Sequence, residues 1–373
     1  MLNILILHSS PILLIQEFKM PRICIVSPSL KIGGIERSLT TLSVYFARKG
    51  NKVFFISCNQ NDRFYEPGKN VVLIEPPFKY KKGFINKYFY YIKLSLFIRK
   101  NVKKVTPDTI LTFGDVFNPL VLFSLLFTKY PVFISDRISP TQNIGFVKNT
   151  LKKIFYPRAN GIIAQTERAA EYKYKIFGKR ISVATIPNAL RELKEQKTPK
   201  ERLIVYAGRL SFEKGPDILI NALSLIKDLN DWKCIFAGEG PLLTSLKELA
   251  VQKGIINKID FIGKVYDIES LFAKAKIFVL PSRTEGFPNA LAEAMALGCA
   301  CISTNCINDN ELIVNNKNGI LLNDQNPKSI SSAIEMLINN DNLLVQFSRE
   351  AKKIKQKLDI EIIGEKYINF ILP

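Results

Sequence analysis

Two glutamates, Glu285 and Glu293, give the sequence its clearest chemical signal. They flank a turn and the start of a helix, because the apolar run 277–280 predicts a buried parallel strand and the Ala-rich stretch from Asn289 predicts a helix. Free backbone N–H groups at a helix start bind anions, and the helix dipole favours negative charge there. Carboxylates accept hydrogen bonds from sugar hydroxyls. The arrangement therefore predicts a site for a sugar joined to a phosphate.

Two cations lie in a second segment, Gly208–Gly215, which follows the first strand expected in the second half of the chain. Arg209 and Lys214 stand five positions apart around a turn, so both side chains can converge on one diphosphate. A guanidinium contributes a fixed fork of donors, whereas an ammonium contributes a mobile point charge. The alternative interpretation is a pair of solvated surface charges.

Glycine turns follow three more of the expected strands. The paired Gly33 and Gly34 open a helix after the first strand, Gly238 and Gly240 follow a strand in the second half, and Gly263 ends another. Glycine lets the backbone approach a ligand closely, although a plain tight turn uses the same residues. The first turn lacks the Gly-x-Gly-x-x-Gly spacing, which counts against a dinucleotide fingerprint.

Together these motifs resemble those of retaining family-4 glycosyltransferases of the GT-B type. The resemblance rests on the Glu-x7-Glu spacing with its Pro-Ser and Gly-Phe-Pro-Asn flanks, on Gly-Arg…Glu-Lys-Gly and on Gly-x-Gly-Pro, and it covers nearly all of residues 21–373. It implies that Arg209 and Lys214 stabilise the departing nucleotide diphosphate. It also implies that Glu285 orients the donor sugar and that Glu293 binds the ribose. The other donor contacts that it implies are Gly33, Gly34, Gly208, Gly238, Gly240, Lys264, Val265, Gly286, Phe287, Pro288 and Asn289.

The resemblance further implies transfer of a sugar from a nucleotide-diphosphate sugar, which we expect to be a UDP-sugar, with retention at the anomeric carbon. We expect no metal and no other cofactor, because the cations and the helix dipole already neutralise the diphosphate. The sequence contains no Asp-x-Asp pair, which removes the usual carboxylate clamp for a metal-bound nucleotide sugar. Its one histidine, His8, disfavours histidine metal sites and a histidine general base.

A charged pair, Asp136 and Arg137, ends a strand expected in the first half. A substrate contact and a structural ion pair are equal alternatives for it. The segment 134–140 resembles the Ser-Glu-Arg-x-x-Pro element of a subgroup that builds bacterial surface polysaccharides such as O-antigen or capsule, with Asp in place of the usual Glu. That resemblance implies a lipid-linked saccharide acceptor. Many relatives carry a histidine in this domain, and this chain has none outside its extreme start.

Positive charge is concentrated in the first half of the 373 residues. Residues 1–187 carry 29 Lys and Arg against 10 Asp and Glu, a net charge of +19, whereas residues 188–373 carry 24 against 23, a net charge of +1. Such a field favours an anionic partner, either a phospholipid surface, a lipid diphosphate or nucleic acid, and the alternative is a merely soluble basic surface. No nucleic-acid-binding module is recognisable, so we expect no nucleic-acid partner.

A basic aromatic run at 78–104 predicts an amphipathic helix on an anionic membrane. The alternative is a solvated helix whose aromatic side faces the core. No apolar run reaches the roughly 20 residues that cross a bilayer. We therefore expect a cytoplasmic protein, peripheral on the inner face of the cell membrane. The basic residues of the run are Lys79, Lys81, Lys82, Lys87, Lys93, Arg99, Lys100, Lys103 and Lys104.

Strand-like and helix-like segments alternate throughout, which predicts an α/β fold of two Rossmann-like domains facing across a cleft. We interpret 1–19 as a candidate upstream extension, 20–187 as the acceptor-side domain, 188–201 as a linker and 202–373 as the nucleotide-sugar domain, with the last helix a candidate to pack back on the first domain. Strands are expected at 23–28, 53–58, 71–74, 109–113, 132–136, 161–165, 183–186, 203–208, 233–237, 259–262, 277–280, 300–304 and 319–322.

Two rival functions fit parts of the sequence. A nucleotide-sugar epimerase of the same architecture shares the fold, but its resemblance does not extend to the Glu-x7-Glu context. A basic nucleic-acid-binding protein fits the charge of the first half, but the second half is neutral. The six cysteines show no Cys-x-x-Cys pair, and five of them fall in apolar runs, which predicts small core residues in a reducing compartment.

Overall fold

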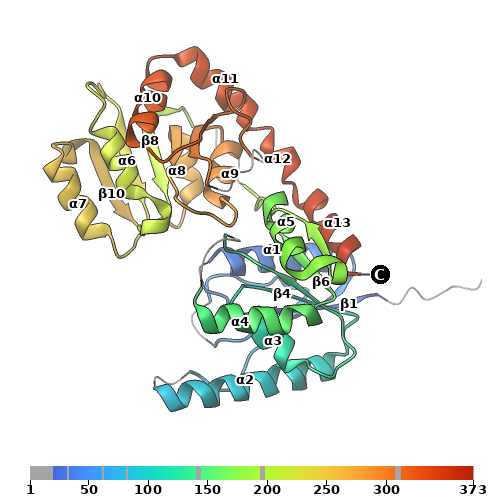
Figure 1. Cartoon of the computed structure of the whole chain (residues 1–373). Coiled ribbons are helices and arrows are strands. Elements are labelled where there is room, and N and C mark those ends of the chain that lie inside the picture. The colour runs from blue at the N-terminus through green and yellow to red at the C-terminus, as the bar shows by residue number, and fades with distance from the viewer. Residues whose placement is uncertain are drawn as a thin grey trace, which may run out of the picture.

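The protein is described by a computed structural model that covers residues 20–31, 33–60, 63–80, 83–139, 144–193, 198–306 and 312–372. Two sheets, each covered by helices, form two domains (Figure 1). All strand pairs in both sheets are parallel, which confirms the predicted α/β architecture. The sequence interpretations of residues 1–19, of Lys81 and Lys82 and of Pro140 lie outside the described residues.

The first sheet has seven strands in the order β3-β2-β1-β4-β5-β6-β7. Its central strand β4 is a fully buried run of five residues, as expected for a parallel strand covered on both faces. The strands are β1 Arg22–Ser27, β2 Lys52–Ser57, β3 Val71–Ile74, β4 Thr109–Phe113, β5 Val132–Ser135, β6 Gly161–Ala164 and β7 Ser182–Thr185. The helices between them are α1 Gly34–Arg48, α2 Phe84–Val105, α3 Asn118–Ser124, α4 Phe146–Phe155 and α5 Glu167–Phe177.

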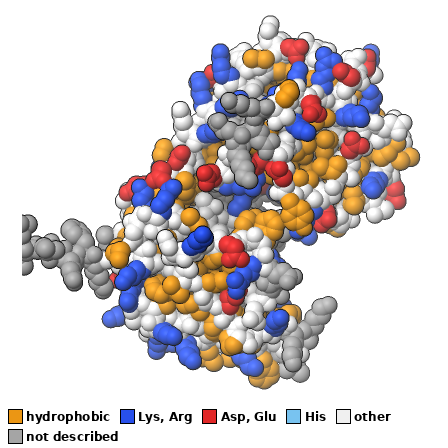
Figure 2. All heavy atoms as spheres, turned by 180° about the vertical axis from the view of Figure 1, so that it is seen from behind, with side chains coloured by type: hydrophobic (Ala, Val, Ile, Leu, Met, Phe, Trp, Pro, Cys, Tyr) orange, Lys and Arg blue, Asp and Glu red, His pale blue; other side chains and the backbone are white. Residues whose placement is uncertain are grey.

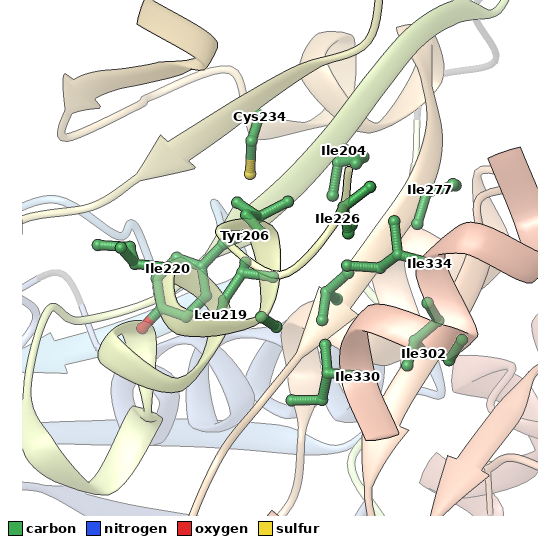
Figure 3. Packing of buried hydrophobic residues seen from close by; sticks show 14 of the residues in the cluster. Ile204, Tyr206, Leu219, Ile220, Ile226, Cys234, Ile277, Ile302, Ile330 and Ile334 are labelled. Atoms are coloured by element: carbon green, nitrogen blue, oxygen red, sulfur yellow. The ribbon is translucent and has the colours of Figure 1, made fainter. Parts of the chain in front are cut away.

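The second sheet has six strands in the order β10-β9-β8-β11-β12-β13. In its core, Ile330 and Ile334 of α10 face Ile302 of β12 (Figure 3). The strands are β8 Glu201–Ala207, β9 Lys233–Ala237, β10 Ile259–Gly263, β11 Ala275–Leu280, β12 Ala300–Thr304 and β13 Ile320–Leu322. The helices are α6 Pro216–Leu223, α7 Leu243–Gln252, α8 Ile268–Lys274, α9 Asn289–Ala296, α10 Pro327–Ile338, α11 Asp341–Ala351, α12 Ile354–Lys357 and α13 Ile360–Ile371.

The C-terminal helix α13 lies on the first domain, shown in red below α12 in Figure 1. Its buried residues Ile363, Tyr367 and Ile371 belong to the same hydrophobic cluster as β1 and α1. Gly364 allows this approach, because a Cβ atom there would lie 2.3 Å from the ring of Tyr45. The chain therefore crosses between the domains twice, once between β7 and β8 and once before α13.

All thirteen strands lie within two residues of the boundaries expected from the sequence. The five cysteines in apolar runs, Cys24, Cys58, Cys234, Cys299 and Cys301, are buried and free. In the described part of the chain, no helix has the length and apolar character that spanning a membrane requires.

Candidate active site

Carboxyl strand ends of the first sheet open onto a cavity of about 1030 Å³, which the segment after β11 of the second sheet also reaches. Its walls come mainly from the first domain, and Phe287 and Asn289 close it from the second. Because ligands of open α/β sheets bind at the carboxyl ends of strands, this cavity and the loops beside it form the candidate active site.

The predicted cation Lys214 and the predicted carboxylate Glu285 lie together in the second domain. The Nζ atom of Lys214 is 2.6 Å from Oε2 of Glu285, and the hydroxyl of Ser282 donates to Oε1 at 2.8 Å. Glu285 is 6% exposed. Two segments that lie 71 residues apart are thereby joined at one ion pair.

Arg283, which sequence reasoning missed, clamps these two segments together. Its guanidinium donates to both oxygens of Asp217 at 2.8 and 2.6 Å and stacks 4.1 Å from the ring of Phe212. Its backbone N–H donates to the carbonyl of Glu213 at 2.8 Å. A bidentate pair of this kind is geometrically specific, so it fixes the turn that carries Lys214. The available signal was an arginine inside the Pro-Ser-Arg-Thr-Glu motif.

Arg209 lies at the start of the same turn, and its side chain is exposed. The hydroxyl of Tyr206 donates to the backbone carbonyl of Arg209 at 2.9 Å, which fixes the backbone while the guanidinium faces solvent. Arg209 and Lys214 therefore lie on one short turn, Lys214 in an ion pair and Arg209 free to reach a ligand from the outside.

The glycine loops of the second domain pack backbone against backbone. Gly238 has φ 147°, and a Cβ atom there would lie 1.9 Å from the carbonyl oxygen of Gly208. A Cβ atom at Gly240 would lie 2.2 Å from the carbonyl oxygen of Leu210. Only glycine allows these contacts. They bring the two loops that carry predicted donor residues together at the carboxyl end of the second sheet.

The segment Gly286–Asn289 reaches across to the first domain. A Cβ atom at Gly286 would lie 2.3 Å from the carbonyl oxygen of Arg137. Pro288 has no N–H group, and the N–H of Asn289 donates to the carbonyl of Phe287 at 3.0 Å. The backbone donors that this segment offers an anion are therefore those of Gly286 and Phe287, a narrower set than the sequence suggested.

Lys264 lies in an aromatic cluster that spans both domains. Its Nζ atom lies 4.9 Å from the ring centre of Tyr266 and 5.8 Å from that of Phe64, a residue of the first domain. The two rings are 6.0 Å apart and inclined by 30°. Val265 packs beside the core of the second domain. Phe64 was not predicted, because it follows β2 in a part of the sequence that carries no motif.

The second glutamate, Glu293, is engaged across the domain boundary. It is 4% exposed and forms an ion pair with Arg37, which lies in the first turn of α1 behind Gly33 and Gly34. Its other oxygen lies 3.6 Å from Arg191. The two glutamates of the motif are therefore held differently, Glu285 within its own domain and Glu293 by the first domain and the connecting segment.

Arg137 and its neighbour Asp136 take different partners. The Arg137 guanidinium stacks 3.5 Å from the ring centre of Phe113, donates to Asn188 and donates to the hydroxyl of Tyr367 at 3.0 Å. Asn188 in turn donates to Oδ1 of Asn289 at 2.9 Å. Arg137 therefore links the first domain to α13 and to the connecting segment, and it also lines the cavity.

Asp136 is enclosed in a charge network inside the first domain. It pairs with Lys173, with Lys152 at 2.8 Å and with the hydroxyl of Tyr156. Burial alone raises the pKa of its carboxyl, but the two ammonium groups hold that pKa below its usual range. This geometry is that of a structural ion cluster, so the charged pair expected between Asp136 and Arg137 is replaced by pairs with two lysines.

Asp115, a carboxylate that sequence reasoning missed, does line the cavity. It accepts hydrogen bonds from the backbone N–H groups of Arg137 at 2.8 Å and Ile138 at 3.2 Å, and it pairs with Lys152 at 2.7 Å. Burial and the neighbouring Asp136 raise its pKa to about 6. Its position directly after a predicted strand was the signal that could have found it.

Two family models match adjoining parts of the chain. The family described as "Glycosyltransferase Family 4" matches residues 32–191, and the family described as "Glycosyl transferases group 1" matches residues 191–354. The chain belongs to glycosyltransferase family 4. In this transferase, the part that matches the first model forms most of the cavity wall, and the part that matches the second model contains the Glu-x7-Glu motif.

Two proteins of similar sequence come from Campylobacter jejuni. The GalNAc-alpha-(1->4)-GalNAc-alpha-(1->3)-diNAcBac-PP-undecaprenol alpha-1,4-N-acetyl-D-galactosaminyltransferase is 26% identical over 94% of this chain and 98% of its own. The N-acetylgalactosamine-N,N'-diacetylbacillosaminyl-diphospho-undecaprenol 4-alpha-N-acetylgalactosaminyltransferase is 24% identical over 92% of this chain and 97% of its own.

Solved structures share the fold of the transferase along its length. Sucrose-phosphate synthase from Thermosynechococcus elongatus superposes with a TM-score of 0.77 at 16% identity, covering 94% of this chain and 98% of its own. HepE from Anabaena, solved in complex with UDP, gives a TM-score of 0.74 at 16% identity, covering 93% and 98%. The fold is therefore GT-B.

Proposed function

We propose that the transferase moves a sugar, with retention, from a UDP-sugar to a lipid-linked saccharide acceptor in the synthesis of a bacterial surface polysaccharide. The observation that carries this proposal is the Lys214–Glu285 pair at the carboxyl end of the second sheet, where Glu285 lies two residues before Phe287, which lines a large cavity with mostly apolar walls. The names of the Campylobacter relatives, which act on undecaprenol-linked saccharides, support the acceptor class. The UDP bound to HepE supports the donor class.

The donor is assigned to the edge of the second sheet. Arg209 and Lys214 stabilise the charge that develops on the departing diphosphate, because preorganised cations act most strongly at the leaving group. The backbone N–H groups of Gly286 and Phe287 share this task. Glu285, fixed by Ser282, orients the sugar hydroxyls, and the ribose binds at Glu293. The aromatic pair Phe64 and Tyr266 lies beside Lys264, where we place the base.

The acceptor is assigned to the cavity of the first domain. Aromatic and aliphatic side chains of α2, α4 and α3 with its N-cap residue form most of its wall, and these include Tyr88, Tyr91, Phe117, Leu120, Val147, Leu151 and Phe155. Polar groups line it at Asp115, Arg137 and Gln165. An amphipathic acceptor matches such a wall, with its reacting hydroxyl at the polar groups and its lipid portion along the apolar side chains.

A peripheral position on an anionic membrane is part of the same proposal. Helix α2 leaves Tyr88, Phe89, Ile92 and Leu96 exposed, and α4 exposes Phe146, Val147 and Ile154. Lys and Arg side chains lie among apolar ones over the lower, N-terminal domain in Figure 2. Apolar side chains that insert at an interface and cations that attract anionic headgroups together support reversible docking.

Two residues of the basic aromatic run 78–104 hold α2 against the rest of the first domain. Arg99 donates to the carbonyls of Ser124 and Leu126 at 3.2 and 2.7 Å, and Tyr90 donates to the carbonyl of Cys58 at 2.9 Å. These side chains hold α2 on the domain, whereas Lys93, Lys100, Lys103 and Lys104 are exposed. The membrane-facing set that we propose therefore leaves Arg99 out.

A donor panel tests the proposed function. Purified protein is incubated with separate UDP- and GDP-sugars in chelator, with and without undecaprenyl-diphosphate-linked saccharides, and nucleotide release and product are measured. We expect one UDP-sugar to be consumed, faster with acceptor, and to give a product with the anomeric configuration of the donor. Consumption of GDP-sugars alone, an inverted product, or activity restored only by a divalent metal would each contradict the corresponding part of the proposal.

A further inference from the structure

Glu293 has two cationic partners that a ribose would have to replace. One is Arg37 of the first domain, and the other is Arg191 of the connecting segment. Arg191 also pairs with Glu269 of α8 at 3.2 Å. Two guanidinium groups and two carboxylates from four separate segments therefore meet at the place where the second carboxylate of the motif lies.

Arg37 occupies a position that favours an anionic partner. It lies in the first turn of α1, where the helix dipole disfavours a cation. Its side chain is 21% exposed, so water only partly screens its charge. Glu36 in the same turn accepts a hydrogen bond from Ser29 at 2.7 Å. If Glu293 turns to another partner, the partly buried Arg37 guanidinium loses its ion-pair partner at a positive helix end, which is unfavourable unless a second anion takes over.

The surroundings of Arg37 are those assigned to the donor. Gly34, at the start of α1, faces Asn289, since a Cβ atom at Gly34 would lie 3.6 Å from Nδ2 of Asn289. Ribose hydroxyls are neutral, so they can bind the Glu293 carboxylate but cannot neutralise the guanidinium. The diphosphate joined to that ribose is the anion that can.

We propose that Arg37 is a donor-binding residue that changes partner when the donor binds. In the ligand-free protein it holds the two domains together through Glu293. When the donor enters, its ribose takes Glu293 and the released Arg37 guanidinium binds the diphosphate from the side opposite to Arg209 and Lys214. This inference rests on the proposed function, because it takes the donor to be a nucleoside diphosphate sugar at this edge.

The exchange has a measurable consequence. A nucleoside without phosphates must break the Arg37–Glu293 pair and offers Arg37 nothing in return. A nucleoside diphosphate breaks the same pair and replaces it. The ratio of the uridine Kd to the UDP Kd therefore contains the contribution of Arg37, separate from any general effect on folding.

Calorimetric titration of uridine and of UDP tests the exchange in Arg37→Gln, with Arg48→Gln as the matched control. Arg48 lies on the same helix and pairs with Glu361 at the surface. In Arg37→Gln we expect uridine to bind several-fold more tightly than in wild type, and the uridine-to-UDP ratio of Kd to fall about 10-fold or more, the size of one lost charge-assisted hydrogen bond. Arg37→Lys should keep part of the ratio, and Arg48→Gln should keep all of it.

Two results would overturn the inference. An unchanged ratio in Arg37→Gln means that Arg37 never contacts the diphosphate, and unchanged or weaker uridine binding means that the pair with Glu293 does not compete with the ribose. Failure of the proposed donor is a different result, because wild-type protein would then bind neither uridine nor UDP while a thermal unfolding transition shows that it is folded.

Discussion

The carboxyl ends of the two sheets are built in opposite ways. In the second domain, the candidate donor residues come from short segments that are locked by backbone contacts, such as that between Gly208 and Gly238. In the first domain, polar side chains from segments as far apart as Asp115 and Lys173 form a closed charge network beneath an apolar wall. Rigid loops that carry cations suit a diphosphate, whereas an apolar wall suits the lipid portion of the proposed acceptor. The comparison predicts that changes on the two sides have different consequences.

Breaking the charge network should have the largest effect, and the effect should be on stability. Replacing Asp136 with Ala leaves Lys173 buried without its carboxylate partner. We expect the free energy of unfolding to fall by about 3–5 kcal/mol, the usual result of stranding a buried charge. Urea unfolding measures this loss. The matched control, Asp231→Ala, removes an exposed pair with Arg202 and should leave the unfolding midpoint unchanged.

Changes at the donor edge should affect turnover more than stability. The exposed Arg209 can be replaced without loss of stability, whereas Lys214→Ala also leaves the buried Glu285 without its ion-pair partner. Replacing Arg209 or Lys214 with Ala should lower turnover by roughly 100- to 1,000-fold, the loss typical of one preorganised contact to transition-state charge. Steady-state rates at saturating donor measure the effect, and thermal unfolding monitors the fold. Near-normal turnover in both variants would contradict the proposal that Arg209 and Lys214 stabilise the departing diphosphate.

The raised pKa of Asp115 should make stability depend on pH on the acceptor side. Its pKa rises from 3.8 to about 6, so the folded state binds this proton more tightly than the unfolded state does. The stabilisation is therefore present below about pH 4 and is lost as the pH rises to about 6. Relative to Asp115→Asn, wild-type protein should lose up to about 3 kcal/mol across this window, since one pKa unit is about 1.4 kcal/mol. Urea titrations at several pH values test this, and a rising or flat difference would contradict it.

Membrane docking should show the smallest effect for each residue. Replacing the exposed Lys93, Lys100, Lys103 and Lys104 with Gln should weaken binding to anionic vesicles, because each basic residue near an anionic leaflet contributes on the order of 1 kcal/mol. Binding should also fall as salt rises. Vesicle sedimentation measures both trends, and donor hydrolysis should be unaffected. Equal binding to neutral and anionic vesicles would refute the electrostatic part of the proposal.

The difference between the two domains also explains which features could be predicted from the sequence. The thirteen strands were predictable because buried parallel strands are short apolar runs closed by Gly, Pro or polar residues. The closeness of Lys214 and Glu285 was predictable because each residue lies in a local motif after one of those strands. Asp115, Phe64 and Arg283 were missed, because their importance arises from partners elsewhere in the fold, such as Lys152, Tyr266 and Asp217.

The pair Asp136 and Arg137 shows most clearly which contacts cannot be predicted from the sequence. Asp136 and Arg137 are adjacent in sequence and opposite in charge, which suggested that they act together. Both residues follow the end of β5 at Ser135, where the chain leaves the sheet, and their side chains reach different surroundings. Asp136 reaches the buried lysines, and Arg137 reaches Asn188 and Tyr367. Such partners come from tertiary packing and have no local signal.

The most direct test of the division between the two edges is hydrogen exchange measured with and without UDP, in buffer free of divalent metal. We predict that UDP slows exchange in the segments 208–215, 238–241 and 285–293, while the cavity helix 146–155 exchanges as before. Protection confined to the first domain, at 114–118 or 146–155, would place the nucleotide in the first domain and contradict the assignment of the donor to the second.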